Sequence, residues 1–122
     1  METINAGGIR PIGPYSGAKR VGDVIWCSGQ TGYDSFAGCL PPDIGDQTRM
    51  ALKKLGCLLE AAGSSLSKVF KCTVYMTDLG EFDAMNAAYA EVFGDNKPAR
   101  ACVGVASLIK GARIEIDCMA EA

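Results

Sequence analysis

The chain has 122 residues, a formal net charge of −2 and a sequence pI near 5.0. This length suits one domain over residues 1–122 with a buried core, and the apolar fraction of 48% is ordinary for a globular protein. The acidic balance, without a basic stripe, argues against electrostatic binding to nucleic acid. No apolar run approaches the length that spans a bilayer, so we expect no membrane partner.

Cysteine and histidine usage limits the chemistry further. Residues 1–12 lack a basic segment followed by an apolar run, so we expect no secretory signal and a cytoplasmic location. The six scattered cysteines form no CxxC pair, which favours reduced thiols over a disulfide framework or a zinc site. Because the chain has no histidine, Ser-His-Asp and Cys-His nucleophiles and HExxH zinc sites are excluded. Catalysis would have to use carboxylates, Arg, Lys, Tyr, Cys or backbone amides.

The first half of the chain predicts a hairpin followed by a long helix. Residues 1–13 are polar and glycine-rich, which predicts a flexible lead-in. Residues 16–21 and 24–28 predict the two strands of the hairpin. The helix is expected to begin after Asp43, a favourable N-cap residue, and to end at Gly63. Its apolar stripe recurs at three- and four-residue spacing and comprises Thr48, Ala51, Leu52, Leu55, Leu58, Leu59 and Ala62.

The second half alternates strands with one further helix. Residues 69–76 predict a strand, and Asp78 is expected to cap a helix over residues 79–93. The last two strands, residues 98–105 and 113–120, are separated by a short connection, so we expect them to form an antiparallel hairpin. Two helices on one face of a mixed sheet make an α+β two-layer sandwich.

The strand that Pro98 opens carries a candidate anion-binding residue, Arg100. Alternation places Arg100, Cys102 and Gly104 on one face. The opposite, core-facing set is expected to be Ala101, Val103 and Val105. A guanidinium grips a carboxylate through two parallel hydrogen bonds, so Arg100 could anchor the carboxylate of a small substrate. A surface arginine paired with an acid on the next strand is the simpler alternative.

A second candidate group, Glu115, lies on the final strand. If both hydrophobic faces meet one core, Arg100 and Glu115 project from the same opposite face of the sheet, a face suited to a subunit contact. The pair is then either a structural ion pair or a site in which Glu115 handles a water while Arg100 holds an anion. Cys102 is the weaker candidate for chemistry, because no base is available in the sequence to activate it.

Four other residues carry open alternatives. Tyr15 follows a stiff segment with two prolines and is either a core-edge aromatic or a ring aimed into a cleft. Ser28 and Gly29 end a strand, where a backbone amide could approach a ligand closely, or they form a plain turn. Asn86 borders the stripe of the second helix and either faces solvent or lines a cleft.

Six short motifs recur in a familiar order along nearly the whole chain. They are Ile12-Gly13-Pro14-Tyr15, Ser28-Gly29-Gln30, Glu60-Ala61-Ala62-Gly63, Thr73-Val74-Tyr75-Met76-Thr77-Asp78-Leu79, Pro98-Ala99-Arg100 and Ile114-Glu115-Ile116. Together they resemble the RidA/YjgF family of reactive-intermediate imine deaminases. The resemblance implies a chorismate-mutase-like α+β protomer, a homotrimer and ligand clefts between subunits.

The resemblance also implies an activity and a set of site residues. The activity is hydrolysis of enamines and imines such as 2-aminoacrylate and 2-iminobutanoate to 2-keto acids and ammonia, with no cofactor and no metal. Arg100 would bind the substrate carboxylate and Glu115 would handle water. The remaining cleft residues implied are Tyr15, Ser28, Gly29, Asn86 and Cys102. Two alternatives are a non-catalytic, keto-acid-binding regulatory trimer and, less favoured by the charge, a translation-inhibiting endoribonuclease.

Overall fold

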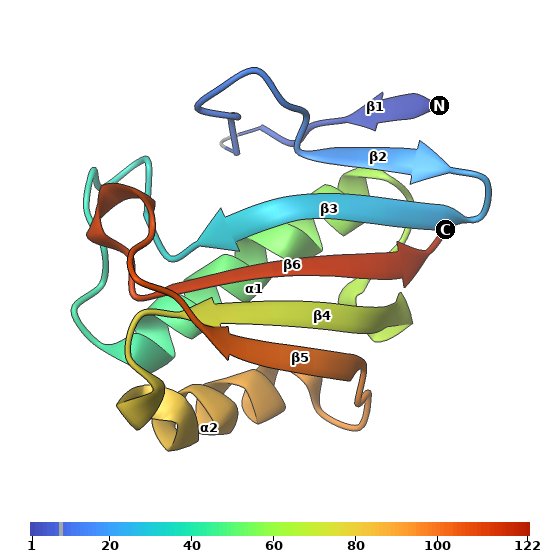
Figure 1. Ribbon diagram of the computed structural model, residues 1–122. Coiled ribbons are helices and arrows are strands. Elements are labelled where there is room, and N and C mark those ends of the chain that lie inside the picture. Colours follow the sequence, from blue (N-terminus) through green and yellow to red (C-terminus); the bar gives the residue numbers. More distant parts are fainter. Residues whose placement is uncertain (8) are drawn as a thin grey trace.

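Six β-strands form one mixed sheet, and both α-helices lie against the same face of it in the computed structural model, which describes residues 1–7 and 9–122 (Figure 1). The strands are β1 (Glu2–Ile4), β2 (Ala18–Val21), β3 (Val24–Thr31), β4 (Val69–Met76), β5 (Ala99–Gly104) and β6 (Ile114–Glu121). The helices are α1 (Ile44–Ala61) and α2 (Phe82–Phe93). The strand order across the sheet is β1-β2-β3-β6-β4-β5. The expected α+β two-layer sandwich is therefore confirmed.

Helix α1 forms where its caps and apolar stripe predict it. The side chain of Asp43 accepts a hydrogen bond from the amide of Asp46 at 3.1 Å, which satisfies a free donor of the first turn. The helix ends at Ala61, and Gly63 follows with a φ of +81°, a conformation that favours glycine. All seven residues of the expected stripe are buried against the sheet.

The N-terminal part of the sheet is larger than the sequence indicates. Strands β2 and β3 form the expected antiparallel hairpin. The expectation of a flexible lead-in over residues 1–13 is wrong at Glu2–Ile4, because β1 pairs with β2 and buries Ile4. A three-residue strand is too short to produce a recognisable alternation. Gly8, within that lead-in, lies outside the described residues.

Strand β6 lies in the centre of the sheet, between β3 and β4, and runs antiparallel to both. Strand β5 pairs with β4 in parallel and forms the edge of the sheet. The expected hairpin of the last two strands is therefore wrong. The alternation within β6 identifies its buried side chains but carries no information about which strand lies beside it. Asp78 caps a short 3₁₀ turn, Leu79–Glu81, that precedes α2.

The six cysteines are free thiols. Three of them, Cys27, Cys118 and Cys72, are buried on the neighbouring strands β3, β6 and β4 and are partners in register. Burial raises the pKa of the Cys72 thiol, which keeps it protonated and unreactive. Within the described part of the chain, neither helix has the length and apolar character needed to cross a lipid bilayer.

Candidate functional site

Arg100 is held between aromatic side chains at the edge of the sheet. Its guanidinium carbon lies 4.8 Å from the ring centre of Tyr89 and 5.6 Å from that of Phe82, both on α2. Its Nη1 lies 3.9 Å from the sulfur of Met85. Among residues 1–7 and 9–122, no carboxylate forms an ion pair with it. A half-buried cation in this position has its charge available for an anionic ligand.

The face on which Arg100 lies corrects the sequence analysis. In the β4–β5 register, Arg100 is opposite Cys72 and Cys102 is opposite Val74, and both β4 residues are fully buried under the helices. Arg100 and Cys102 therefore lie on the same side of the sheet, as expected. That side faces the helices, whereas the sequence analysis placed both residues on the opposite side. Val103, expected in the core, is 40% exposed on the uncovered side. The alternation of a strand does not show which of its two faces packs against the helices. Here the aromatic rings of α2 allow an arginine to lie at the edge of the helix-covered face.

A shallow hollow between α2 and β5 brings Arg100 and Asn86 together. This α2–β5 hollow is lined mainly by Asn86, Tyr89, Phe93, Asn96, Lys97 and Arg100. It combines an aromatic wall, two cations and two side-chain amides. Asn86 thus lines a cleft, which was one of its two alternatives. Arg100 lowers the pKa of the nearby Cys102 thiol, but burial outweighs it and the net pKa is raised, so Cys102 is a poor nucleophile here.

Glu115 occupies a different position, on the uncovered face of the sheet beside Gly29. A Cβ at Gly29 would lie only 2.6 Å from Glu115 Oε2, so the carboxylate fills the space that the missing side chain leaves. Burial, and secondarily the charge of Asp117, raises the pKa of the Glu115 carboxyl. The hydroxyl of Tyr75 donates to Asp117 at 3.0 Å, which holds that second acid in place. A carboxylate with a raised pKa is a better general base.

Arg100 and Glu115 therefore lie on opposite faces of the sheet in one chain. The neighbours of Glu115 along β6, Ile114 and Ile116, are fully buried under the helices, so Glu115 points away from them. The expectation that Arg100 and Glu115 project from one surface is wrong, because it depended on a hairpin that does not form. The structure brings Glu115 together with Gly29, and Arg100 with Asn86 and Cys102.

Ser28 and Tyr15 lie on the Glu115 side. Ser28 Oγ donates to the backbone oxygen of Ser16 at 2.6 Å, and its amide donates to Gly17, so it ties the segment before β2 to β3. This segment carries Tyr15, which is 46% exposed and whose hydroxyl accepts from the amide of Ile12 at 3.3 Å. The ring thus lies at a surface, as its cleft-facing alternative requires.

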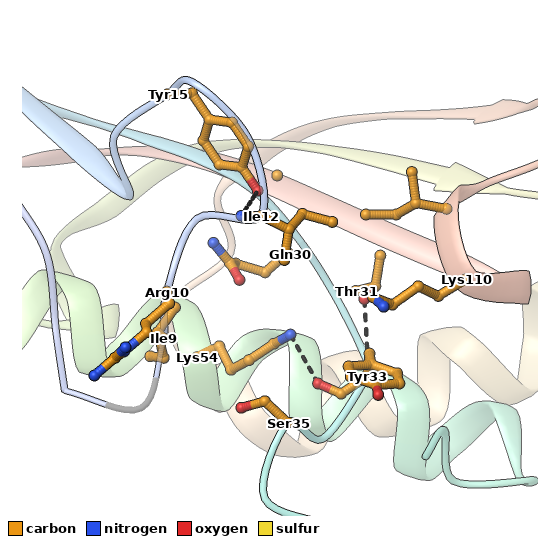
Figure 2. Close-up of a pocket in the computed structure, with 12 residues that line it drawn as sticks. Ile9, Arg10, Ile12, Tyr15, Gln30, Thr31, Tyr33, Ser35, Lys54 and Lys110 are labelled. Atoms are coloured by element: carbon orange, nitrogen blue, oxygen red, sulfur yellow. Dashed lines mark hydrogen bonds between the residues drawn. The ribbon is translucent and has the colours of Figure 1, made fainter. Parts of the chain in front are cut away.

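A pocket at the end of β3 contains Tyr15 and Gly29 together with residues that the sequence did not single out (Figure 2). We call it the β3-end pocket. The unforeseen members include Thr31, Tyr33, Lys54 and Lys110, and Gln30 from the Ser28-Gly29-Gln30 motif lines the pocket as well. Helical periodicity places Lys54 on the solvated face of α1, but Tyr33 and the segment after it cover this part of the helix. Such coverage by a loop has no signal in the periodicity.

Comparison with known proteins identifies the fold and the family. The sheet with two helices on one face matches the YjgF gene product of Escherichia coli with a TM-score of 0.94 at 34% identity, over 99% of this chain and 98% of that one. It also matches E. coli TdcF with bound serine, with a TM-score of 0.95 at 32% identity, over 100% and 99%. The class of protein is therefore the α+β domain of RidA/YjgF structures.

The chain belongs to the Endoribonuclease L-PSP family, which is the RidA/YjgF family, and the family model matches residues 6–122. A RutC family protein of Pyrococcus horikoshii is 46% identical over 112 residues, 91% of this chain and 89% of the relative. A human 2-iminobutanoate/2-iminopropanoate deaminase is 43% identical over 110 residues, 89% and 80% of the two chains. The resemblance drawn from the short motifs is confirmed.

Proposed function

We propose that this protein hydrolyses small 2-imino acids and their enamines to 2-keto acids and ammonia. The observation that carries the proposal is the half-buried Arg100, which has aromatic neighbours on α2 and no ion-paired carboxylate among the described residues. Relatives at about 43% identity are named 2-iminobutanoate/2-iminopropanoate deaminase, which supports this reaction class. The TdcF relative binds serine, a molecule with the α-carboxylate that Arg100 is proposed to hold.

The proposed chemistry divides between two groups. Arg100 donates two parallel hydrogen bonds to the substrate carboxylate and so holds the imine carbon in place. Glu115 takes a proton from a water as the water oxygen bonds to the imine carbon, and it gives that proton to the nitrogen, which yields a carbinolamine with one hydroxyl and one amino group. Glu115 then takes the proton of this hydroxyl and passes it to the amino group, so that the C–N bond breaks, ammonia leaves and the carbonyl of the keto acid forms. The raised pKa of Glu115 suits both the acceptance and the return of the proton.

The proposed site is completed by a second copy of the chain. Arg100 and Glu115 lie on opposite faces of one sheet, so a single chain cannot direct both at one small substrate. The uncovered sheet face exposes half of Trp26 and 40% of Val103, an apolar surface suited to a subunit contact. A ring of three copies would bring the Arg100 side of one chain to the Glu115 side of the next.

Mixing two inactive variants tests both the reaction and the shared site. Arg100→Ala lacks the anchor and Glu115→Gln lacks the base, so each alone should be inactive in a keto-acid release assay coupled to a dehydratase that generates the imine. When the two are unfolded and refolded together at equal amounts, roughly a quarter of the sites receive an intact Arg100 and an intact Glu115. Activity near that fraction is expected, and its absence in the mixture would contradict a shared site.

A charged substitution on the uncovered face gives an independent test. Val103→Glu should leave the fold intact by circular dichroism but convert the oligomer to monomer in analytical ultracentrifugation, with activity lost. Phe36→Glu is the matched control, since Phe36 is 88% exposed and belongs to the segment between β3 and α1. A Val103→Glu variant that keeps both its assembly and its activity would overturn the proposed contact.

A keto-acid-binding regulatory oligomer is the second candidate, because the same Arg100 would bind the product. Saturable binding of 2-ketobutyrate that requires Arg100, without faster imine hydrolysis, would favour it. The family description names an endoribonuclease. The net charge of −2 and the lack of histidine do not support RNA cleavage. RNA cleavage that copurifies with the protein and is lost in Arg100→Ala would reverse this ranking.

A further inference from the structure

The β3-end pocket is unusual for an acidic protein because its lining carries cations. Lys54 and Lys110 line it, and Arg10 lies at its rim with its guanidinium directed outward (Figure 2). Among the described residues that line the pocket, none is acidic. Each cation comes from a different part of the chain: Arg10 from the segment before β2, Lys54 from α1 and Lys110 from the connection between β5 and β6. The fold therefore gathers positive charge at this point.

Lys54 is held in the pocket rather than in solvent. Its Nζ donates to the backbone oxygen of Tyr33 at 3.0 Å, and an ammonium has further donor capacity for a ligand. Burial lowers the pKa of Lys54, and the charge of Asp34 only partly opposes this. The Asp34 carboxylate accepts from the amides of Phe36 and Ala37, so it is engaged in its own turn. An anion in the pocket would stabilise the charged form of Lys54.

Lys110 approaches the same point from the opposite side. Its Nζ lies 4.8 Å from the ring centre of Tyr33, above the residue whose carbonyl binds Lys54. The backbone of Lys110 has a φ of 54°, a left-handed conformation in which a lysine is strained. The polar groups of Gln30 and Thr31 complete the lining between the two lysines.

We propose that the β3-end pocket binds a small oxyanion, a carboxylate or phosphate group, between Lys54 and Lys110. The pocket also contains Gly29, beside which the Glu115 carboxylate lies. If the proposed function holds, a carboxylate there would be the second acidic group of a dicarboxylic imino acid, and the enzyme would accept acidic side chains. A phosphate there would instead belong to a separate, regulatory ligand.

The test is a titration of the full-length protein with succinate and, separately, with inorganic phosphate. Binding is monitored through the NMR chemical shifts of the backbone amides. Chloride at matched ionic strength is the control for screening. We expect saturable shifts at Thr31 and Tyr33 with at least one oxyanion. Tighter succinate binding assigns the site to carboxylates, and tighter phosphate binding assigns it to phosphate. Shifts that do not saturate, or that chloride reproduces, overturn the proposal.

Three variants locate the binding. Lys54→Gln and Lys110→Asn should each lower the affinity for the oxyanion by roughly tenfold or more, since each removes a charge-assisted contact. Asparagine tolerates the left-handed backbone at position 110, so that variant should fold even if the other does not. Lys53→Gln is the matched control, because Lys53 is exposed on the same helix and does not line this pocket. Equal affinity in all three variants and the parent overturns the proposal.

One more variant separates this inference from the proposed function. This comparison uses anions with a single acidic group, inorganic phosphate and acetate, because succinate is able to reach Arg100 of a neighbouring copy as well. Arg100→Ala should keep the shifts of these anions at Thr31 and Tyr33, because within one chain Arg100 lies at the α2–β5 hollow and not in this pocket. Loss of those shifts in Arg100→Ala would show that the anion binds at Arg100, which contradicts a separate site. An inactive but oxyanion-binding parent protein would instead refute the deaminase proposal and leave this one standing.

Discussion

The position of the Glu115 carboxylate depends on the missing side chain of Gly29, and Gly29→Ala tests this dependence directly. The new Cβ would lie 2.6 Å from Glu115 Oε2 and 2.8 Å from its carboxyl carbon, whereas ordinary contacts begin at 3.4 Å. The carboxylate would therefore have to retreat by about 0.8 Å, since the backbone of β3 is fixed by its neighbours. The nearest atoms belong to the end of a flexible side chain, so the fold should persist and the change should fall on the position of the base.

A displacement of this size in a catalytic group costs roughly 10- to 100-fold in rate. We expect kcat/KM for imine hydrolysis to fall by that factor while the unfolding free energy changes by about 1 kcal/mol or less. The assay is the dehydratase-coupled release of keto acid, with urea unfolding as the measure of stability. Gly7→Ala is the control, because a Cβ there meets no atom within 4 Å.

A double variant tests the steric cause. Glu115→Asp shortens the acid and makes room for the alanine, so Gly29→Ala/Glu115→Asp should be more stable than the sum of the single changes indicates. A Gly29→Ala protein with the activity of the parent, or with a Glu115 carboxylate that a crystal structure shows unmoved, would refute the reasoning.

Three further predictions concern charge and capping. Arg100→Lys keeps the charge but loses the fork, so kcat/KM in the coupled assay should fall roughly 10- to 100-fold, with Arg49→Lys unaffected. Folding favours protonated Glu115, because its pKa is raised above 4.5; this stability is present below that pH and lost as pH rises through the folded pKa. The stability advantage of Glu115→Gln over the parent, measured by urea unfolding, should therefore be larger at pH 7 than at pH 4. Asp43→Ala removes the cap of α1 and should lower the melting temperature by roughly 3–6 °C.

The sequence predicts those parts of the fold that depend on local periodicity. The caps and the apolar stripe of α1 are local features, and the structure has them where Asp43 and Gly63 indicate. The strand partners of β6 are not local, because every edge of an alternating strand offers the same hydrogen-bonding groups. The hairpin error followed from this, and the wrong placement of Arg100 and Glu115 on one surface followed from the hairpin.

The sequence identifies the residues of the candidate site better than it identifies their arrangement in space. Arg100, Asn86 and Cys102 do lie together, and so do Glu115 and Gly29. Their division between two faces could not be foreseen, since a charged residue on a helix-covered face contradicts the usual pattern of burial. The aromatic rings of α2 make it possible, and ring-to-cation contacts between distant segments leave no trace in spacing.

The separation of Arg100 and Glu115 has a consequence for how the protein would behave in dilute solution. A catalytic pair that no single chain can assemble makes turnover per molecule depend on total concentration, as binding equilibria do. If the site is shared between copies, a protein diluted below the dissociation constant of its oligomer would keep its helices and sheet but lose its activity. Specific activity should then show a lag on dilution and recover on concentration, without any unfolding.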